Sequence, residues 1–127
     1  MTVDTLPPDL AQAIGELEQT FSGRIAIEAS DASGVVIQLH DVVLAERWTP
    51  RLGSLWFVLP YNYPDAPVYP YYIVGATLSG PGVPALQPVV WRGMAAIQVS
   101  LRQTAWDPAR DTVVGCVLQT QSWLRLT

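Results

Sequence analysis

The stretch 55-LWFVLPYNYPDAPVYP-70 decides the fold that we predict for this chain. Its first five residues are apolar, with aromatic and β-branched members, which predicts a buried strand over Leu52–Leu59. Prolines follow at positions 60, 64, 67 and 70. Each proline fixes φ and lacks an amide donor, so we expect a stiff, non-helical crossing after this strand.

An N-terminal helix is predicted before this stretch. Pro7 and Pro8 suit a first helical turn, and Asp9 complements the positive end of the helix dipole. The apolar residues that then recur at helical spacing are Leu10, Ile14, Leu17 and Phe21.

Strands are predicted on both sides of the central stretch. Alternating or continuous apolar residues indicate strands over residues 24–29, 35–44 and 69–74, in addition to Leu52–Leu59. One helix followed by four consecutive strands predicts an α+β fold, with the helix packed on a four-stranded antiparallel meander.

The second half of the chain is predicted to be less regular. Residues 75–88 are rich in Gly, Pro and Ser, which favours a long irregular loop, and residues 94–101 read as a short strand or extended segment. Trp106-Asp107-Pro108 then introduces a C-terminal helix over residues 109–126.

Composition limits the class of protein. The 127 residues, half of them hydrophobic, fit one domain spanning residues 1–127 around one core. No apolar run is long enough to span a membrane, and no secretory signal is visible, so a cytoplasmic location is the default expectation. The single Cys116 cannot form an internal disulfide, which fits a reducing compartment.

Charge makes nucleic acid an unsuitable partner. The formal net charge is −4, and all seven basic residues are arginines, with no basic run. Codon bias is the simpler explanation for the missing lysines. The sequence predicts no cofactor and no metal site, and it leaves the oligomeric state open.

The order of these features resembles the core of the ubiquitin-conjugating (E2) fold. The residues that carry the resemblance are the Tyr63-Pro64-Asp65-Ala66-Pro67 turn after the third strand and Trp106-x-Pro108 before the next helix. The resemblance implies a minimal UBC-like fold in which Tyr63, Pro64, Pro67 and Trp106 are structural. It also implies two partners, an E1-like activating enzyme and a ubiquitin-like protein.

The catalytic motif of that family is altered in this chain. No cysteine lies between the tyrosine-proline turn and Trp106, and Leu86-Gln87-Pro88 replaces the family's His-Pro-Asn, which excludes an ordinary thioester-forming E2. Val99-Ser100-Leu101 resembles the family's Ile-Cys-Leu, with Ser100 as a candidate nucleophile that would carry the ubiquitin-like protein as an oxyester. A serine hydroxyl is less acidic than a thiol and needs a base.

Each further catalytic candidate has a structural alternative. Gln87 could donate to a developing oxyanion, but an exposed loop glutamine is the simpler interpretation. Asp107 could be the base, or it could cap the following helix, as could Asp111. His40, the only histidine, could be the base, or it could be a surface or packed residue of the second strand. Cys116 is either a rival nucleophile or a small core residue.

Partner-binding residues are predicted at two places. Trp91 and Arg92 combine an aromatic ring and a cation that could contact a partner's tail. Trp91 could equally be a surface tryptophan half buried on the sheet. Leu10 and Ile14 on the first helix are also predicted to bind. That helix is acidic, whereas many E2 enzymes engage the activating enzyme through a basic first helix.

Two hypotheses of function remain from the sequence. In the first, the protein is an E2-like enzyme that accepts a ubiquitin-like C-terminus from an E1-like enzyme. In the second, it is a noncatalytic E2-variant or RWD-like module that binds a ubiquitin-like protein or scaffolds its complex. The absence of lysine slightly favours the enzyme, because an E2 readily modifies its own lysines.

Overall fold

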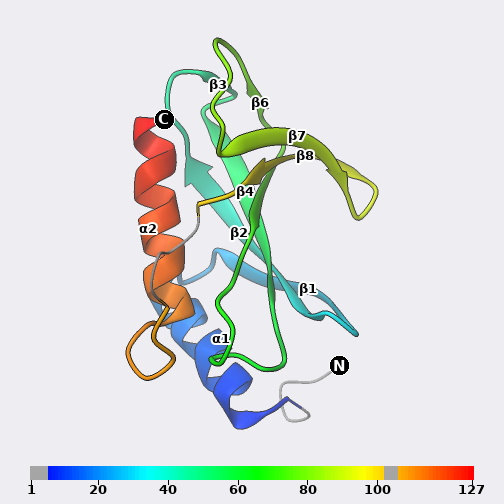
Figure 1. Cartoon of the computed structure of the whole chain (residues 1–127), viewed down its shortest axis with the longest axis vertical. Helices are drawn as coiled ribbons and strands as arrows, with labels where there is room; N and C mark the ends of the chain where they lie inside the picture. Colours follow the sequence, from blue (N-terminus) through cyan, green and yellow to red (C-terminus); the bar gives the residue numbers. More distant parts are fainter. Residues whose placement is uncertain (1–5, 102–105) are drawn as a thin grey trace.

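Two helices cover one face of a six-stranded antiparallel sheet in the computed structural model, which describes residues 6–101 and 106–127 (Figure 1). The helices are α1 (Pro8–Thr20) and α2 (Val113–Leu126). In spatial order the strands are β1 (Ile25–Asp31), β2 (Gly34–Val43), β4 (Leu52–Leu59), β5 (Tyr71–Val74), β8 (Met94–Val99) and β7 (Leu86–Trp91). A separate two-stranded sheet pairs β3 (Trp48–Thr49) with β6 (Thr77–Leu78). The predicted α+β class is confirmed.

Helix α1 packs its apolar stripe into the core. The stripe residues Leu10, Ile14 and Leu17 are all 0% exposed and belong to one cluster with the core-facing residues of the sheet. The binding role predicted for Leu10 and Ile14 is therefore corrected, since buried side chains offer no surface to a partner. The same periodicity that predicted the helix also gave the face by which it packs.

The sheet extends beyond the predicted meander. The four predicted strands are neighbours in the order β1-β2-β4-β5, but β8 and β7 follow β5, so the sheet has six strands rather than four. The extended segment predicted over residues 94–101 is β8. Residues 75–88, predicted to be an irregular loop, instead contain β6 and the first residues of β7.

Helix α2 begins at Val113, four residues later than predicted. The backbone N–H groups of Arg110 and Asp111 both donate to the Asp107 carbonyl, which closes a turn before the helix. Thr112 is the residue that caps α2, because its Oγ1 accepts a hydrogen bond from the Gly115 N–H at 3.1 Å.

The two edge strands are each irregular. In β1 the pairing register shifts between Ile27 and Ala29. In β7 the irregularity is Pro88. The Ser100 N–H donates to the Ala85 carbonyl, and in an antiparallel ladder every second residue makes such bonds to the neighbouring strand. The backbone of Gln87 therefore faces β8, and that of Pro88 faces outward. Pro88 thus lies where its missing N–H costs no hydrogen bond within the sheet.

Substituting Gly15 tests the packing of α1. Gly15 lies in the exposed middle of the helix, and an added Cβ would meet no atom within 4 Å. Gly15→Ala is therefore expected to raise the free energy of unfolding by about 0.5–1 kcal/mol, because alanine loses less backbone entropy on folding. Urea unfolding followed by circular dichroism measures the change, and a destabilised variant would contradict the helix as described.

In the described part of the chain, no helix is long and apolar enough to cross a membrane. Within the same ranges, no group of three or more His, Cys, Asp or Glu side chains is arranged to hold a metal ion.

Candidate functional site

The face of the sheet opposite the helices carries aromatic and amide side chains. Along β4, Leu55 and Phe57 are buried on the helix side, so the alternation of a strand places Trp56 on the other side. Trp56 pairs across the sheet with Tyr72, and Tyr72 pairs with Gln98. These neighbours form a continuous row on the face that no helix covers.

A third ring, from the edge of the sheet, joins this row. Trp91 at the end of β7 stacks on Tyr72, with ring centroids 4.2 Å apart and planes 13° apart. It also meets Trp56 edge-on, with centroids 6.1 Å apart. The Trp56 Nε1–H donates to Ser54 Oγ at 3.0 Å. We call Trp56, Tyr72 and Trp91 the aromatic cluster; it holds the β7–β8 hairpin against the sheet.

An ion pair fixes the tip of that hairpin. Arg92 (φ 51°) and Gly93 (φ 78°) form its two-residue turn, as expected for a turn with two left-handed residues. Arg92 Nη1 donates to Asp31 Oδ2 at 2.8 Å, and Asp31 lies at the β1–β2 turn, whose tip is on the same side of the molecule (Figure 1). Because β1 and β7 are opposite edges of the sheet, this contact links its two edge hairpins.

The charge of Arg92 affects two neighbouring groups. Its hydrogen bond lowers the pKa of Asp31, with a further contribution from the Ser33 amide. Burial raises the pKa of the Tyr72 hydroxyl, and the nearby Arg92 guanidinium partly opposes that rise. The guanidinium also lies 5.2 Å from the Trp91 ring centroid. Trp91 and Arg92, predicted to meet a partner, thus already contact each other and the sheet.

Ser100 and Gln87 lie on this same face. Gln87 of β7 pairs with Gln98 of β8, and Gln98 Nε2 donates to Ser100 Oγ at 3.0 Å. Among the side-chain hydrogen bonds of the described residues, this amide is the partner of Ser100 Oγ, and an amide is not a general base. The structure therefore brings together two of the predicted catalytic residues without a base beside the hydroxyl.

Asp107, the third predicted catalytic residue, is engaged elsewhere. Its Oδ1 accepts a hydrogen bond from the Ala109 N–H at 3.0 Å, and its own N–H donates to Asp111 Oδ2 at 2.7 Å. Both carboxylates thus serve the turn before α2. This arrangement supports the capping interpretation of Asp107 and Asp111.

The tyrosine-proline turn is tied to the C-terminal helix. Trp106 Nε1 donates to the Pro64 carbonyl at 2.7 Å, and the Trp106 and Tyr63 rings lie 6.3 Å apart. Tyr63 Oη accepts a hydrogen bond from the Val113 N–H, the first residue of α2, at 2.9 Å. The predicted contact between Trp106 and this turn is confirmed. Tyr63, Pro64 and Trp106 therefore have structural positions.

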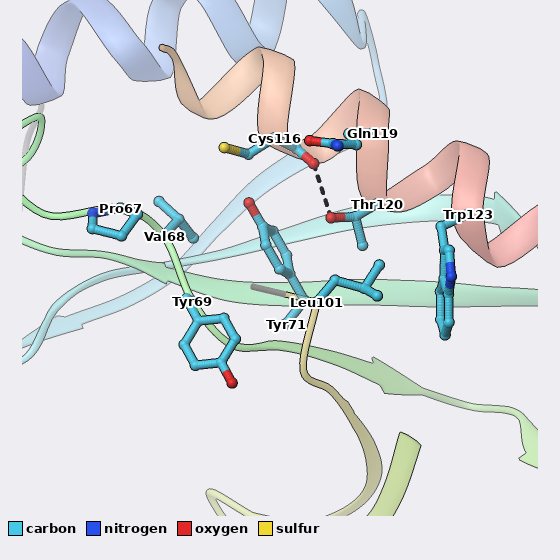
Figure 2. A pocket seen from close by; sticks show the side chains of 9 residues that line it. All are labelled: Pro67, Val68, Tyr69, Tyr71, Leu101, Cys116, Gln119, Thr120 and Trp123. Atoms are coloured by element: carbon cyan, nitrogen blue, oxygen red, sulfur yellow. Dashed lines mark hydrogen bonds between the residues drawn. The ribbon is translucent and has the colours of Figure 1, made fainter. Parts of the chain in front are cut away.

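A pocket of about 350 Å³ lies between α2 and the segment that leads into β5 (Figure 2). Its lining residues are Pro67, Val68, Tyr69, Tyr71, Leu101, Cys116, Gln119, Thr120 and Trp123. The lining comes from separate parts of the chain, and none of these segments has a periodicity that indicates a cavity. Sequence reasoning missed this pocket.

Cys116 lies in the wall of this pocket as an un-ionised thiol. Burial raises its pKa to about 11; the charge of Asp111 adds to the rise, and a hydrogen bond with Tyr71 opposes it. With 8% exposure and a raised pKa, Cys116 matches the core alternative rather than an activated nucleophile.

Methylthiolation of Cys116, in which the thiolate forms a mixed disulfide and methanesulfinate leaves, is expected to show this shift directly. Because the thiolate is the reactive form, the rate with methyl methanethiosulfonate should rise about tenfold per pH unit from pH 8 to pH 10 and level off only near pH 11. A short unstructured cysteine peptide with blocked ends, whose thiol pKa is about 8.5, should level off much earlier. Intact mass gives an unambiguous readout, because the chain has one cysteine. A plateau below pH 9 would contradict the assigned environment.

Comparisons with known proteins gave no match to this chain. No protein-family model matches the chain, and neither the curated proteins nor the solved structures contain a significant match.

Proposed function

We propose that this protein is a noncatalytic E2-like module that binds a ubiquitin-like protein through the face bearing the aromatic cluster. The observation that carries the proposal is the cluster itself. Three partly exposed rings lie on the face opposite the helices, fixed by one another and by the Arg92–Asp31 ion pair. Tryptophan, tyrosine and arginine dominate the energetics of protein interfaces, and rigid rings lose little entropy on binding.

The surroundings of Ser100 favour binding over acyl transfer. An oxyester-forming serine needs its proton removed, and the partner of Ser100 Oγ is the Gln98 amide. Asp107 is held in the turn before α2. The resemblance to the E2 core then suggests the class of partner, and the geometry gives a surface on which the Ser100 hydroxyl is bonded to an amide rather than to a base.

Site-specific crosslinking tests the binding hypothesis. Gln87 of β7 is exposed and lies on the face of the aromatic cluster, because it pairs with Gln98 beside Tyr72, so benzoyl-phenylalanine at this position can report on a partner without entering the core. In a lysate of the native organism it is expected to crosslink a ubiquitin-like protein. The same group at Leu118, which is 45% exposed on α2, should not. Crosslinks at Gln87 that contain only unrelated proteins would refute the proposal.

The purified partner then allows a quantitative test of the aromatic cluster. Trp91→Ala removes a stacked ring from the proposed interface and is expected to weaken binding at least about tenfold by calorimetry. Leu118→Ala, on the opposite side of the sheet, should leave affinity unchanged. Equal effects of the two substitutions would show that this face is not the interface.

Acyl transfer to Ser100 remains the second candidate, because Ser100 and Gln87 share one face through Gln98. The two hypotheses differ in one covalent bond. With the partner, an E1-like enzyme and ATP, an oxyester would appear as a mass adduct that resists reducing agent, is removed by hydroxylamine and is lost in Ser100→Ala. The absence of lysine removes the usual background of self-modification. Binding without an adduct is the result expected from a noncatalytic module.

A further inference from the structure

The pocket beside α2 is separate from the proposed partner surface. Tyr71 in its wall lies on the helix side of β5, whereas Tyr72 of the aromatic cluster lies on the opposite side. One wall is the α2 face with Cys116, Gln119, Thr120 and Trp123, and the other comes from residues 67–71 and Leu101 (Figure 2). Its volume of about 350 Å³ is within the range of small-molecule sites.

The lining of the pocket is uncharged at neutral pH. None of its nine residues is acidic, basic or histidine, and burial keeps the one thiol protonated. Aromatic walls come from Tyr69, Tyr71 and Trp123. A charged ligand would lose its hydration without gaining a partner, so the chemistry of the lining selects a neutral, mainly apolar molecule.

One hydroxyl in the wall, that of Tyr71, is held by a weak partner, the Cys116 thiol, which a ligand oxygen can replace. The Tyr71 side chain is 2% exposed, and no nitrogen or oxygen atom of the described residues hydrogen-bonds to its hydroxyl. Its polar neighbour is the Cys116 thiol, a weak hydrogen-bonding group (Figure 2). Buried hydroxyls usually have a nitrogen or oxygen partner, and leaving one without it destabilises the site.

The hydroxyl of Thr120, also in the lining, is already used. Thr120 Oγ1 donates to the Cys116 carbonyl at 2.8 Å, which is a normal bond to the preceding helical turn. The Tyr71 ring is held by Phe57, with centroids 5.3 Å apart, so its hydroxyl has a fixed place. The pocket therefore presents the Tyr71 O–H as a positioned donor in a mainly apolar wall, to which Tyr69 and Gln119 add further polar groups.

We propose that this pocket binds a neutral, mainly apolar small molecule that carries one acceptor oxygen, which takes the hydrogen bond of the Tyr71 hydroxyl. The ligand class is an aromatic or aliphatic ketone, ester or ether of about ten or more non-hydrogen atoms. Binding needs no covalent step, and it does not depend on the proposed partner of the sheet face.

A matched pair of probes isolates the hydrogen bond. The probes 1-indanone and indane share a bicyclic skeleton, but only 1-indanone has an acceptor oxygen. In titrations followed by NMR of the full chain, both should shift signals of pocket residues, and 1-indanone should bind about threefold to tenfold more tightly, the usual net effect of one hydrogen bond. Saturating 1-indanone should also slow the reaction of Cys116 with methyl methanethiosulfonate at pH 9.

Two tyrosine variants provide the control. Tyr71→Phe removes only the proposed donor and is expected to abolish the preference for 1-indanone while leaving indane binding unchanged. Tyr69→Phe, from the same pocket wall, should keep the preference. No shift of pocket signals and no protection of Cys116 with either probe would overturn the proposal. Equal affinities in the wild type, or a preference that survives Tyr71→Phe, would overturn the role of the hydroxyl.

Discussion

Gly34→Ala is expected to lower the free energy of unfolding by about 4 kcal/mol, a large fraction of the roughly 5–15 kcal/mol that stabilises a typical domain. A Cβ at this position would lie 2.2 Å from the Leu59 carbonyl oxygen and 3.0 Å from the Pro60 Cα. Both are backbone atoms of the strand end that pairs with β2, so no side-chain rotation relieves the clash. Gly34 also has φ +142°, which residues with a side chain rarely adopt.

A second glycine separates the clash from the backbone strain. Gly23 has φ +76°, but a Cβ there would meet no atom within 4 Å. Gly23→Ala should cost only the conformational term of about 1–2 kcal/mol. Urea unfolding of the two variants, followed by circular dichroism, gives both values. Equal losses would mean that β2 does not approach Leu59 as described.

Tyr63→Phe is expected to lower the free energy of unfolding by about 2 kcal/mol. The hydroxyl accepts the hydrogen bond of the Val113 N–H, a buried group at the start of α2. Without it this donor is left unsatisfied, because Thr112 already caps the Gly115 N–H and cannot serve both. The ring contact with Trp106 would remain.

Tyr61→Phe is the matched control for this effect. Tyr61 lies two residues earlier in the same turn and is partly exposed, so loss of its hydroxyl should change stability by less than about 0.5 kcal/mol. Equal effects of the two changes would indicate that the Tyr63–Val113 bond does not hold α2 to the turn. Amide exchange of the first turn of α2 should also accelerate only in Tyr63→Phe.

The first half of the fold is readable because each element has one dominant pattern. Strand β4 occupies Leu52–Leu59 as predicted, since a continuous apolar run bounded by Pro60 has few other solutions. Helix α1 follows its stripe of buried residues. The first residue of α2 is harder to predict, because Asp107 and Pro108 resemble a helix start although Thr112 is the N-cap.

The β7–β8 hairpin shows why the second half was less predictable. Pro88 inside β7 argues against a strand unless the strand is known to be at an edge, which only the assembled sheet reveals. Arg92-Gly93 is a weak turn signal, because arginine rarely adopts φ above zero. With the hairpin missed, the shared face of Gln87 and Ser100 could not be seen.

The aromatic cluster, the ion pair and the pocket all depend on contacts between residues that are distant in sequence. Trp91 stacks on Tyr72, and Arg92 pairs with Asp31, 61 residues earlier. The pocket around Tyr71 similarly needs α2 to pack across β5. Local periodicity gives the side of an element that is apolar, but it carries no information about which distant residue that side meets.

The outward-facing Pro88 also bears on behaviour at high concentration. An exposed sheet edge can recruit another chain and grow into a fibre, and Val90 at 80% exposure makes β7 an apolar edge. Pro88 interrupts the row of outward donors at its centre, and the register shift in β1 disturbs the opposite edge. Both ends of the sheet thus resist templated polymerisation, which lets a half-hydrophobic chain display an aromatic face without forming cross-β aggregates.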